Sequence, residues 1–184
     1  MENRSSLSIV GISYALICLV IIVFAIMNPF ANTCIKGDCI NGYGTYTYHS
    51  GMKYEGEWKN GLRHGKGKLT YPDIYTYYGE WKNNRMDGRG TMVYYWYKYE
   101  GEWKNGNMNG KGMITYFNGI KYIGTMKNGN REGYASMTYP DGREFRGEWK
   151  DDRIYGKGVI KFPDGKEVEI ESASDRLIKN FPKP

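Results

Sequence analysis

The residue types that most often carry catalysis are few in this sequence. There are two histidines, His49 and His64, and no serine lies in a nucleophile-elbow context. No pair of acids stands apart from a glutamate pattern that recurs along the chain, as in Glu55 and Glu57. Because acid–base and nucleophilic catalysis need such groups within hydrogen-bond reach of one another, we expect both histidines to be structural or solvated. The sequence therefore predicts a protein that is not an enzyme, with no catalytic residues and no cofactor.

The cysteines allow more than one chemistry. Cys34 and Cys39 enclose a short loop, and the third cysteine, Cys18, lies in an apolar stretch. In an exported domain, Cys34 and Cys39 would form a disulfide that caps the open end of a sheet; otherwise both remain free thiols. A zinc site is the weakest interpretation, since two cysteines supply half of a tetrahedral ligand set and only His49 is nearby. We expect no metal site.

The run Gly65-Lys66-Gly67 has the composition of a phosphate-binding loop but not its context. A phosphate loop needs a following Ser or Thr and a helix whose amino terminus faces the phosphate, and neither is present here. The run, with Lys or Arg between the glycines, also recurs in four of the five copies of a repeat described below, which favours a structural role.

One pattern recurs through most of the chain. An aromatic residue returns at Tyr54, Tyr77, Tyr99, Tyr122 and Phe145, in steps of 23, 22, 23 and 23 residues. A glycine follows two residues later in each copy, and two residues after that comes a tryptophan, replaced once by Met126. A fixed period of this length is typical of a repeat array.

The pattern resembles the MORN repeat, whose core is roughly Tyr-x-Gly-x-Trp/Phe-x-x-Gly-x-x-x-Gly-x-Gly. The resemblance covers residues 54–171 as five repeats, preceded by a partial unit at residues 31–53 and followed by a tail at residues 172–184. It implies a scaffold that binds protein partners, including further copies of itself, and a link to phospholipid headgroups.

Alternation with a period of two predicts that each repeat forms two strands. Tyr54, Gly56 and Trp58 share one face, whereas Glu55 and Glu57 share the other. The expected fold is all-β, an elongated antiparallel meander of hairpins with roughly a dozen strands. We expect the strand glycines to leave room for aromatic rings of adjacent strands, and each Asn-Gly pair, such as Asn60-Gly61, to begin a loop longer than two residues.

The aromatic residues are the candidate binding surface. Either the rings pack on one another, or an open single-layer sheet leaves them exposed as a shallow groove, and exposed apolar patches mark partner sites. The candidates are Tyr54, Trp58, Tyr77, Trp81, Trp96, Tyr99, Trp103, Tyr122 and Trp149. An alternative function for such a groove is the binding of a glycan or cell-envelope polymer by ring stacking.

The amino-terminal segment differs from the repeats. Residues 9–27 carry no charge and are almost wholly apolar, and about 20 such residues span a bilayer as a helix. Residues 1–30 therefore predict either a transmembrane anchor helix or a cleaved signal. Arg4 precedes the stretch, which favours a cytoplasmic amino terminus. The repeats would then lie on the non-cytoplasmic side of the membrane, or be secreted if the segment is cleaved.

The charge distribution limits the partners. The net charge is +6, but acids and bases are mixed within every repeat, whereas a nucleic-acid site needs a concentrated basic stripe. We therefore expect no nucleic-acid binding. Weak attraction to anionic phospholipid headgroups is compatible with this charge. The leading hypothesis is a membrane-tethered, non-enzymatic scaffold for a protein partner, including another copy of itself.

Overall fold

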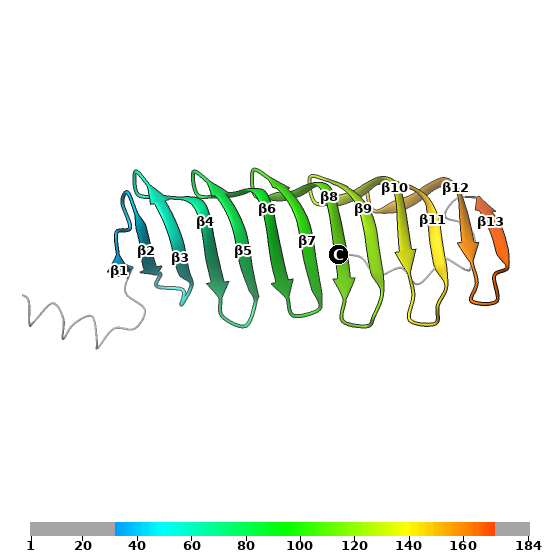
Figure 1. Ribbon diagram of the computed structural model, residues 1–184, viewed down its shortest axis with the longest axis horizontal. Coiled ribbons are helices and arrows are strands. Elements are labelled where there is room, and N and C mark those ends of the chain that lie inside the picture. Colours follow the sequence, from blue (N-terminus) through cyan, green and yellow to red (C-terminus); the bar gives the residue numbers. More distant parts are fainter. Residues whose placement is uncertain (1–31, 172–184) are drawn as a thin grey trace, which may run out of the picture.

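The computed structural model describes residues 32–171 as one antiparallel sheet of thirteen strands. The strands lie side by side in the order in which they occur along the chain, which makes the sheet an elongated meander (Figure 1). The all-β prediction is confirmed. The strands are β1 (Thr33–Gly37), β2 (Tyr43–Thr47), β3 (Lys53–Lys59), β4 (Leu62–Tyr71), β5 (Tyr75–Lys82), β6 (Arg85–Tyr94), β7 (Tyr97–Lys104), β8 (Asn107–Tyr116), β9 (Lys121–Lys127), β10 (Asn130–Thr138), β11 (Glu144–Lys150), β12 (Arg153–Lys161) and β13 (Glu167–Glu171).

The predicted anchor helix at residues 1–30 and the tail at residues 172–184 lie outside the described residues. Between residues 32 and 171, the chain forms no helix with the length and apolarity that a membrane span requires.

Each repeat is a hairpin with a two-residue turn. Lys59 pairs with Leu62, so only Asn60 and Gly61 separate β3 from β4. Both turn residues have positive φ, 52° and 71°, as a type I′ turn requires. The prediction of a longer loop was wrong, because the residues that follow Gly61 belong to β4. The same positive-φ turn closes the other four hairpins, at Asn83-Asn84, Asn105-Gly106, Asn128-Gly129 and Asp151-Asp152.

An irregularity in the ladder accounts for the residues that suggested a longer loop. Gly56 pairs with Gly67 and Glu57 pairs with His64, so Gly65 and Lys66 have no partner residue on β3. The Lys66 N–H instead donates a hydrogen bond to the Glu57 carboxylate, over 2.9 Å. In the next repeat, the Arg89 N–H donates to the Glu80 carboxylate over 3.0 Å. The recurring glutamate thus satisfies a backbone donor that the bulge leaves out of the ladder.

The glycine pairs make room for the tyrosine rings. A Cβ atom placed on Gly56 would lie 2.7 Å from the hydroxyl of Tyr54 on the same strand. A Cβ atom on Gly67 would lie 2.6 Å from Cε2 of the same ring, which reaches it from the adjacent strand. The expectation of a ring from an adjacent strand therefore holds for Gly67 and is wrong for Gly56, which accommodates the ring of its own strand; one pair of glycines serves one tyrosine.

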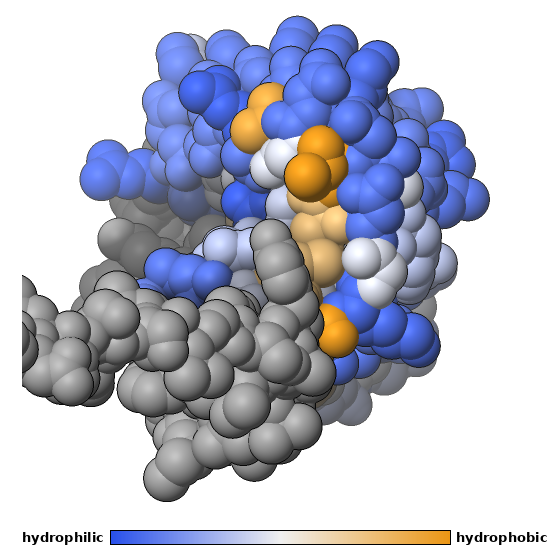
Figure 2. Space-filling model, turned by 90° about the vertical axis from the view of Figure 1, so that its left-hand side faces the viewer, coloured by the Kyte–Doolittle hydropathy of each residue, from blue (hydrophilic) through white to orange (hydrophobic). Residues whose placement is uncertain are grey.

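The ends of the strands form two long edges of the array, and these two edges carry different turns. The hairpin edge carries the five two-residue turns, and the inter-repeat edge carries the turns between successive repeats; these edges are at the top and bottom of Figure 1. Figure 2 looks onto the β1 end of the array, where hydrophilic residues form much of the described outline and apolar residues lie toward the middle. The buried tyrosine and tryptophan rings belong to one core that extends along the array.

Candidate interaction surface

The predicted aromatic residues form the core of the array. Tyr54, Tyr77, Tyr99 and Tyr122 have no exposed surface, and the four tryptophans at the repeat positions are at most 8% exposed. These eight rings pack on one another, which is the first of the two alternatives that the sequence left open. A sugar or a partner therefore finds no open ring face among them. The ninth candidate, Trp96, is partly buried and packs against the same core at the inter-repeat edge, where its ring contacts those of Tyr97 and Tyr116.

The rings contact one another edge to face along the array. The Tyr54 ring lies 5.0 Å from Trp58 of its own repeat and 5.4 Å from Trp81 of the next, at interplanar angles near perpendicular. The same two contacts recur where Tyr77 meets Trp81 and Trp103, at 5.2 Å each. Such edge-to-face contacts are favourable beyond the apolar area that they bury. Tyr54 and Tyr77 are therefore each held by a tryptophan of their own repeat and by one of the next.

The hydroxyls of the four tyrosines and the Nε1–H groups of three of the tryptophans donate to backbone carbonyls. The Tyr77 hydroxyl donates to the Glu80 carbonyl over 3.0 Å, and the Trp81 Nε1–H donates to the Gly67 carbonyl over 3.1 Å. This hydrogen bond links the tryptophan of one repeat to the backbone of the preceding repeat, and Trp58 and Trp103 make the equivalent bond. Burial raises the pKa of the Tyr77 phenol well above its usual range. These contacts explain why the residues are Tyr and Trp at these positions.

Two arginines extend the ring packing at the hairpin edge. The Arg63 guanidinium lies 4.5 Å from the Trp81 ring, and Arg131 lies 4.3 Å from the Trp149 ring. Arg63 donates to the Asn84 backbone carbonyl over 2.9 Å, and Arg131 to that of Asp152 over 3.1 Å. Each arginine therefore joins one repeat to the turn of the next.

The two cysteines of the candidate disulfide are bonded in the structure. The Cys34 and Cys39 sulfurs are 2.05 Å apart, and the bond closes the loop after β1. Within this loop, the Asp38 carboxylate accepts the backbone N–H groups of Ile40 and Asn41. These hydrogen bonds lower the pKa of Asp38. Across residues 32–171, no three His, Cys, Asp or Glu side chains lie together in a way that could hold a metal ion.

The histidines lie apart. His64 is on β4 opposite Glu57, and its Nδ1 is buried without a hydrogen bond in the described part of the chain. The His49 N–H donates to Asn32 at the first inter-repeat turn.

The wet face, the side of the sheet opposite the tyrosine and tryptophan rings, carries a ladder of opposite charges. A basic residue of one repeat stands opposite a glutamate of the next, as Lys66 opposite Glu80 and Arg89 opposite Glu102. The ladder is interrupted in the fourth repeat. Lys111 stands opposite Thr125, and Tyr134 stands opposite Glu148.

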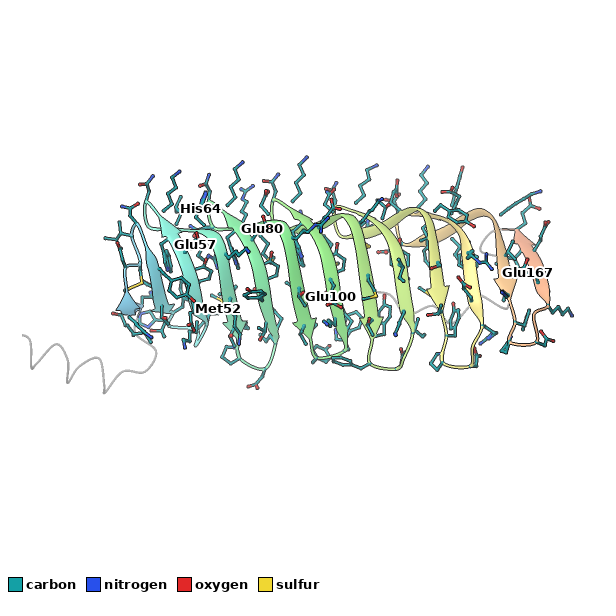
Figure 3. All side chains as sticks on the ribbon, viewed as in Figure 1. Met52, Glu57, His64, Glu80, Glu100 and Glu167 are labelled. Atoms are coloured by element: carbon teal, nitrogen blue, oxygen red, sulfur yellow. A yellow bond between two sulfur atoms is a disulfide. The ribbon has the colours of Figure 1, made fainter. Side chains whose placement is uncertain are left out.

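A hollow of about 800 Å³ lies on the wet face and reaches from β4 to β10. Its apolar side chains include Tyr78, Met113, Ile123 and Tyr134. Ile123 and Tyr134 are 55% and 64% exposed, so both are accessible to a partner. Figure 3 shows the side chains along the array, with Glu80 and Glu100 of this hollow labelled. This is the surface that we select as the candidate partner site. A second hollow, of about 1150 Å³, lies near the hairpin edge and is lined by mixed charges.

The inter-repeat edge carries a second group of exposed apolar side chains. Ile74, Tyr95 and Phe117 lie at three successive inter-repeat turns and are 38%, 73% and 63% exposed. Behind them, Tyr75 and Tyr94 stack nearly parallel at 5.8 Å. The last two inter-repeat turns instead carry Pro-Asp-Gly. We call Ile74, Tyr95 and Phe117 the apolar turn tips.

The match to a family model follows these repeats closely. The MORN repeat model matches residues 40–53, 54–73, 77–97, 99–121, 122–142 and 145–167, which is more than half of the chain. The chain belongs to the MORN-repeat family. The six matches correspond to the partial unit and the five MORN repeats that the sequence predicts. MORN-repeat arrays are in general scaffolds that contact proteins or membrane lipids. No curated protein matches the chain.

Sequence reasoning selected the ring positions and missed the wet-face hollow. It noted Met126 as a departure from the repeat, but this residue lies on the ring face, as does Ala135. The departures that open the hollow are Thr125 and Tyr134, at positions where other repeats carry an acid and a base. An alignment of the five repeats by their charged positions would have found them.

Proposed function

We propose that this MORN-repeat protein is a membrane-tethered, non-enzymatic scaffold, with residues 9–27 as its anchor and a protein partner bound by its array. The position at which the chain enters the sheet supports this tethering. Thr33 at the start of β1 pairs with Thr47, and the His49 N–H donates to the Asn32 side chain over 2.9 Å. Asn32 is therefore at the inter-repeat edge, the edge that carries the apolar turn tips.

An anchor that ends a few residues before Asn32 would bring this edge toward the bilayer. Ile74, Tyr95 and Phe117 suit the headgroup region, where aromatic and apolar side chains gather. The Cys34–Cys39 disulfide supports a non-cytoplasmic array, because structural disulfides persist in oxidising compartments. The scaffold role is supported by the family and by the wet-face hollow, in which Ile123 and Tyr134 are accessible.

The tethering can be tested with the full chain reconstituted into phosphatidylcholine vesicles. Cys18→Ser leaves the disulfide pair, and a polarity-sensitive fluorophore is attached through Tyr95→Cys or, as control, through Lys104→Cys beside the hairpin edge. We expect nitroxide-labelled lipids to quench the probe at position 95 several-fold more than the probe at position 104. Equal quenching would contradict this orientation, and loss of the protein on carbonate extraction would contradict the anchor.

A further inference from the structure

We propose that the fourth repeat forms a peptide-docking site on the wet face, selective for a partner segment with an acid and a base on either side of apolar residues. The site consists of Lys111, Ile123, Tyr134 and Glu148, and we call it the fourth-repeat site. This inference rests on the proposed scaffold function, since it names the site and the chemistry of the partner.

The two charges of the site stand opposite uncharged residues, whereas the equivalent charges of the preceding repeats, such as Lys66 and Glu80, stand opposite one another in the register. Lys111 faces Thr125 where the preceding repeats have Glu80 or Glu102, and Glu148 faces Tyr134 where the following repeat has Lys157. Lys111 and Glu148 are both exposed. Neither is in an ion pair within residues 32–171. One positive and one negative charge therefore flank the interruption.

Apolar side chains fill the space between these charges. Ile123 on β9 and Tyr134 on β10 are exposed, and Met113 on β8 is half-buried beside them in the hollow. Desolvation of an aromatic or aliphatic anchor in a pocket typically contributes most of the binding energy at an interface. A contiguous group of exposed apolar side chains marks a partner site.

The geometry fixes the spacing that a partner needs. Lys111 is on β8 and Glu148 on β11, three strands away in the sheet. At about 4.8 Å per strand, the two backbones are roughly 14 Å apart, which an extended peptide covers in about four residues. A complementary segment thus places its acid at Lys111, its base at Glu148 and one or two apolar side chains over Ile123 and Tyr134. Opposite charges at the two ends also disfavour segments with one sign of charge.

The test uses the full chain in detergent micelles, so its outcome does not depend on whether residues 9–27 span a bilayer. A displayed library of random peptides is selected on the wild-type chain. We expect a consensus in which an acid and a base are about four residues apart, with apolar residues between them. Enrichment on Tyr134→Ser or Ile123→Ser should fall at least tenfold, because both side chains are exposed and their replacement leaves the core intact.

Charge reversal provides the specificity test. On Lys111→Glu, the selected peptides should carry a base at both ends of the apolar residues. The matched control is Lys161→Glu, which reverses an exposed lysine opposite Glu167 outside the site and should leave the wild-type consensus unchanged.

Three outcomes would overturn the proposal. The first is the absence of a consensus on the wild-type chain, and the second is a consensus that Tyr134→Ser retains. The third is a concentration-dependent dimer, seen by light scattering, that Ile123→Ser abolishes, since a second copy of the chain would then be the occupant. Failure of the vesicle experiment alone would contradict the tethering but not this site.

Discussion

The guanidinium of Arg131 lies between the Trp149 ring, 4.3 Å away, and the carboxylate of Asp152, which its Nε–H reaches over 3.0 Å. The Arg131 side chain is 1% exposed. The chain repeats this relationship with Arg63 and Asn84, and replaces it elsewhere with methionine and glycine: Met86 bonds to Gly106, and Met108 to Gly129, through the backbone alone. Arginine thus occurs where the second turn residue of the next repeat is polar.

Arg131→Ala should destabilise the array strongly. It leaves the partly buried Asp152 carboxylate without its cation, and breaking a buried pair typically costs about 3–5 kcal/mol. The free energy of unfolding can be measured with urea by tryptophan fluorescence. The control is the double variant Arg131→Met with Asp152→Gly, which copies the Met108 and Gly129 pair and should recover most of the stability. A double variant as unstable as Arg131→Ala would contradict this account.

Trp103→Ala should remove one of the links between repeats. Trp103 is 5% exposed, contacts the rings of Tyr77 and Tyr99, and donates to the Gly90 carbonyl over 3.2 Å. Truncation of a buried tryptophan costs about 3–5 kcal/mol. The comparison is Trp96→Ala, whose ring is partly buried at the inter-repeat edge and should cost less. Equal losses for the two variants in the same urea experiment would argue against the tryptophan links.

High pH should unfold the array through its buried tyrosines. Burial raises the pKa of Tyr116 to about 12 and that of Tyr54, Tyr99 and Tyr122 further, whereas the unfolded value is about 10. Because the folded pKa values are the higher ones, this stabilisation is complete below about pH 10 and is lost as the pH rises toward the folded values. Ionised-tyrosine absorbance should show a late component that coincides with loss of near-ultraviolet circular dichroism. Full ionisation with native dichroism would contradict the burial.

Cys34→Ser should loosen the β1 end. Closing so short a loop stabilises by roughly 2 kcal/mol in the chain-entropy model. Amide hydrogen exchange should accelerate in β1 and β2 and stay unchanged in β7 and β8, because each strand contacts only its neighbours. Alkylation without reduction, followed by mass spectrometry, tests the bond itself. Protection of β1 that survives the substitution would show that the disulfide does not hold this edge.

Much of the fold follows from the repeat. The period of Tyr54, Gly56 and Trp58 is enough to predict paired strands, a ring core and the glycine pairs that accommodate it. The turns were harder, since Asn83-Asn84 and Asp151-Asp152 contain no glycine and are recognised only by their position in the repeat. The sequence did not reveal the bulge at Gly65, because apolar and polar side chains alternate in the usual way both before and after it.

The candidate site was less predictable than the fold. Ring positions attract attention as binding residues, but rings such as Tyr54 and Trp58 are buried because two neighbours satisfy each of them. Pairing of Lys111 with Thr125, and of Tyr134 with Glu148, depends on the register between repeats, which composition does not reveal. Each of the two arginines has its polar partner 21 residues later in the sequence: Asn84 follows Arg63, and Asp152 follows Arg131. A comparison of the repeats could have revealed this spacing.

Met126 has a mechanical consequence. At this position the array lacks the indole that at Trp58, Trp81 and Trp103 donates to the glycine carbonyl of the preceding repeat, so cohesion between β8 and β9 depends on the backbone ladder and on the Met126 side chain. Under tension along its long axis, the array should part there before it parts between other repeats. A tethered chain of this kind would yield at a fixed point under load, and the fourth-repeat site lies across that point.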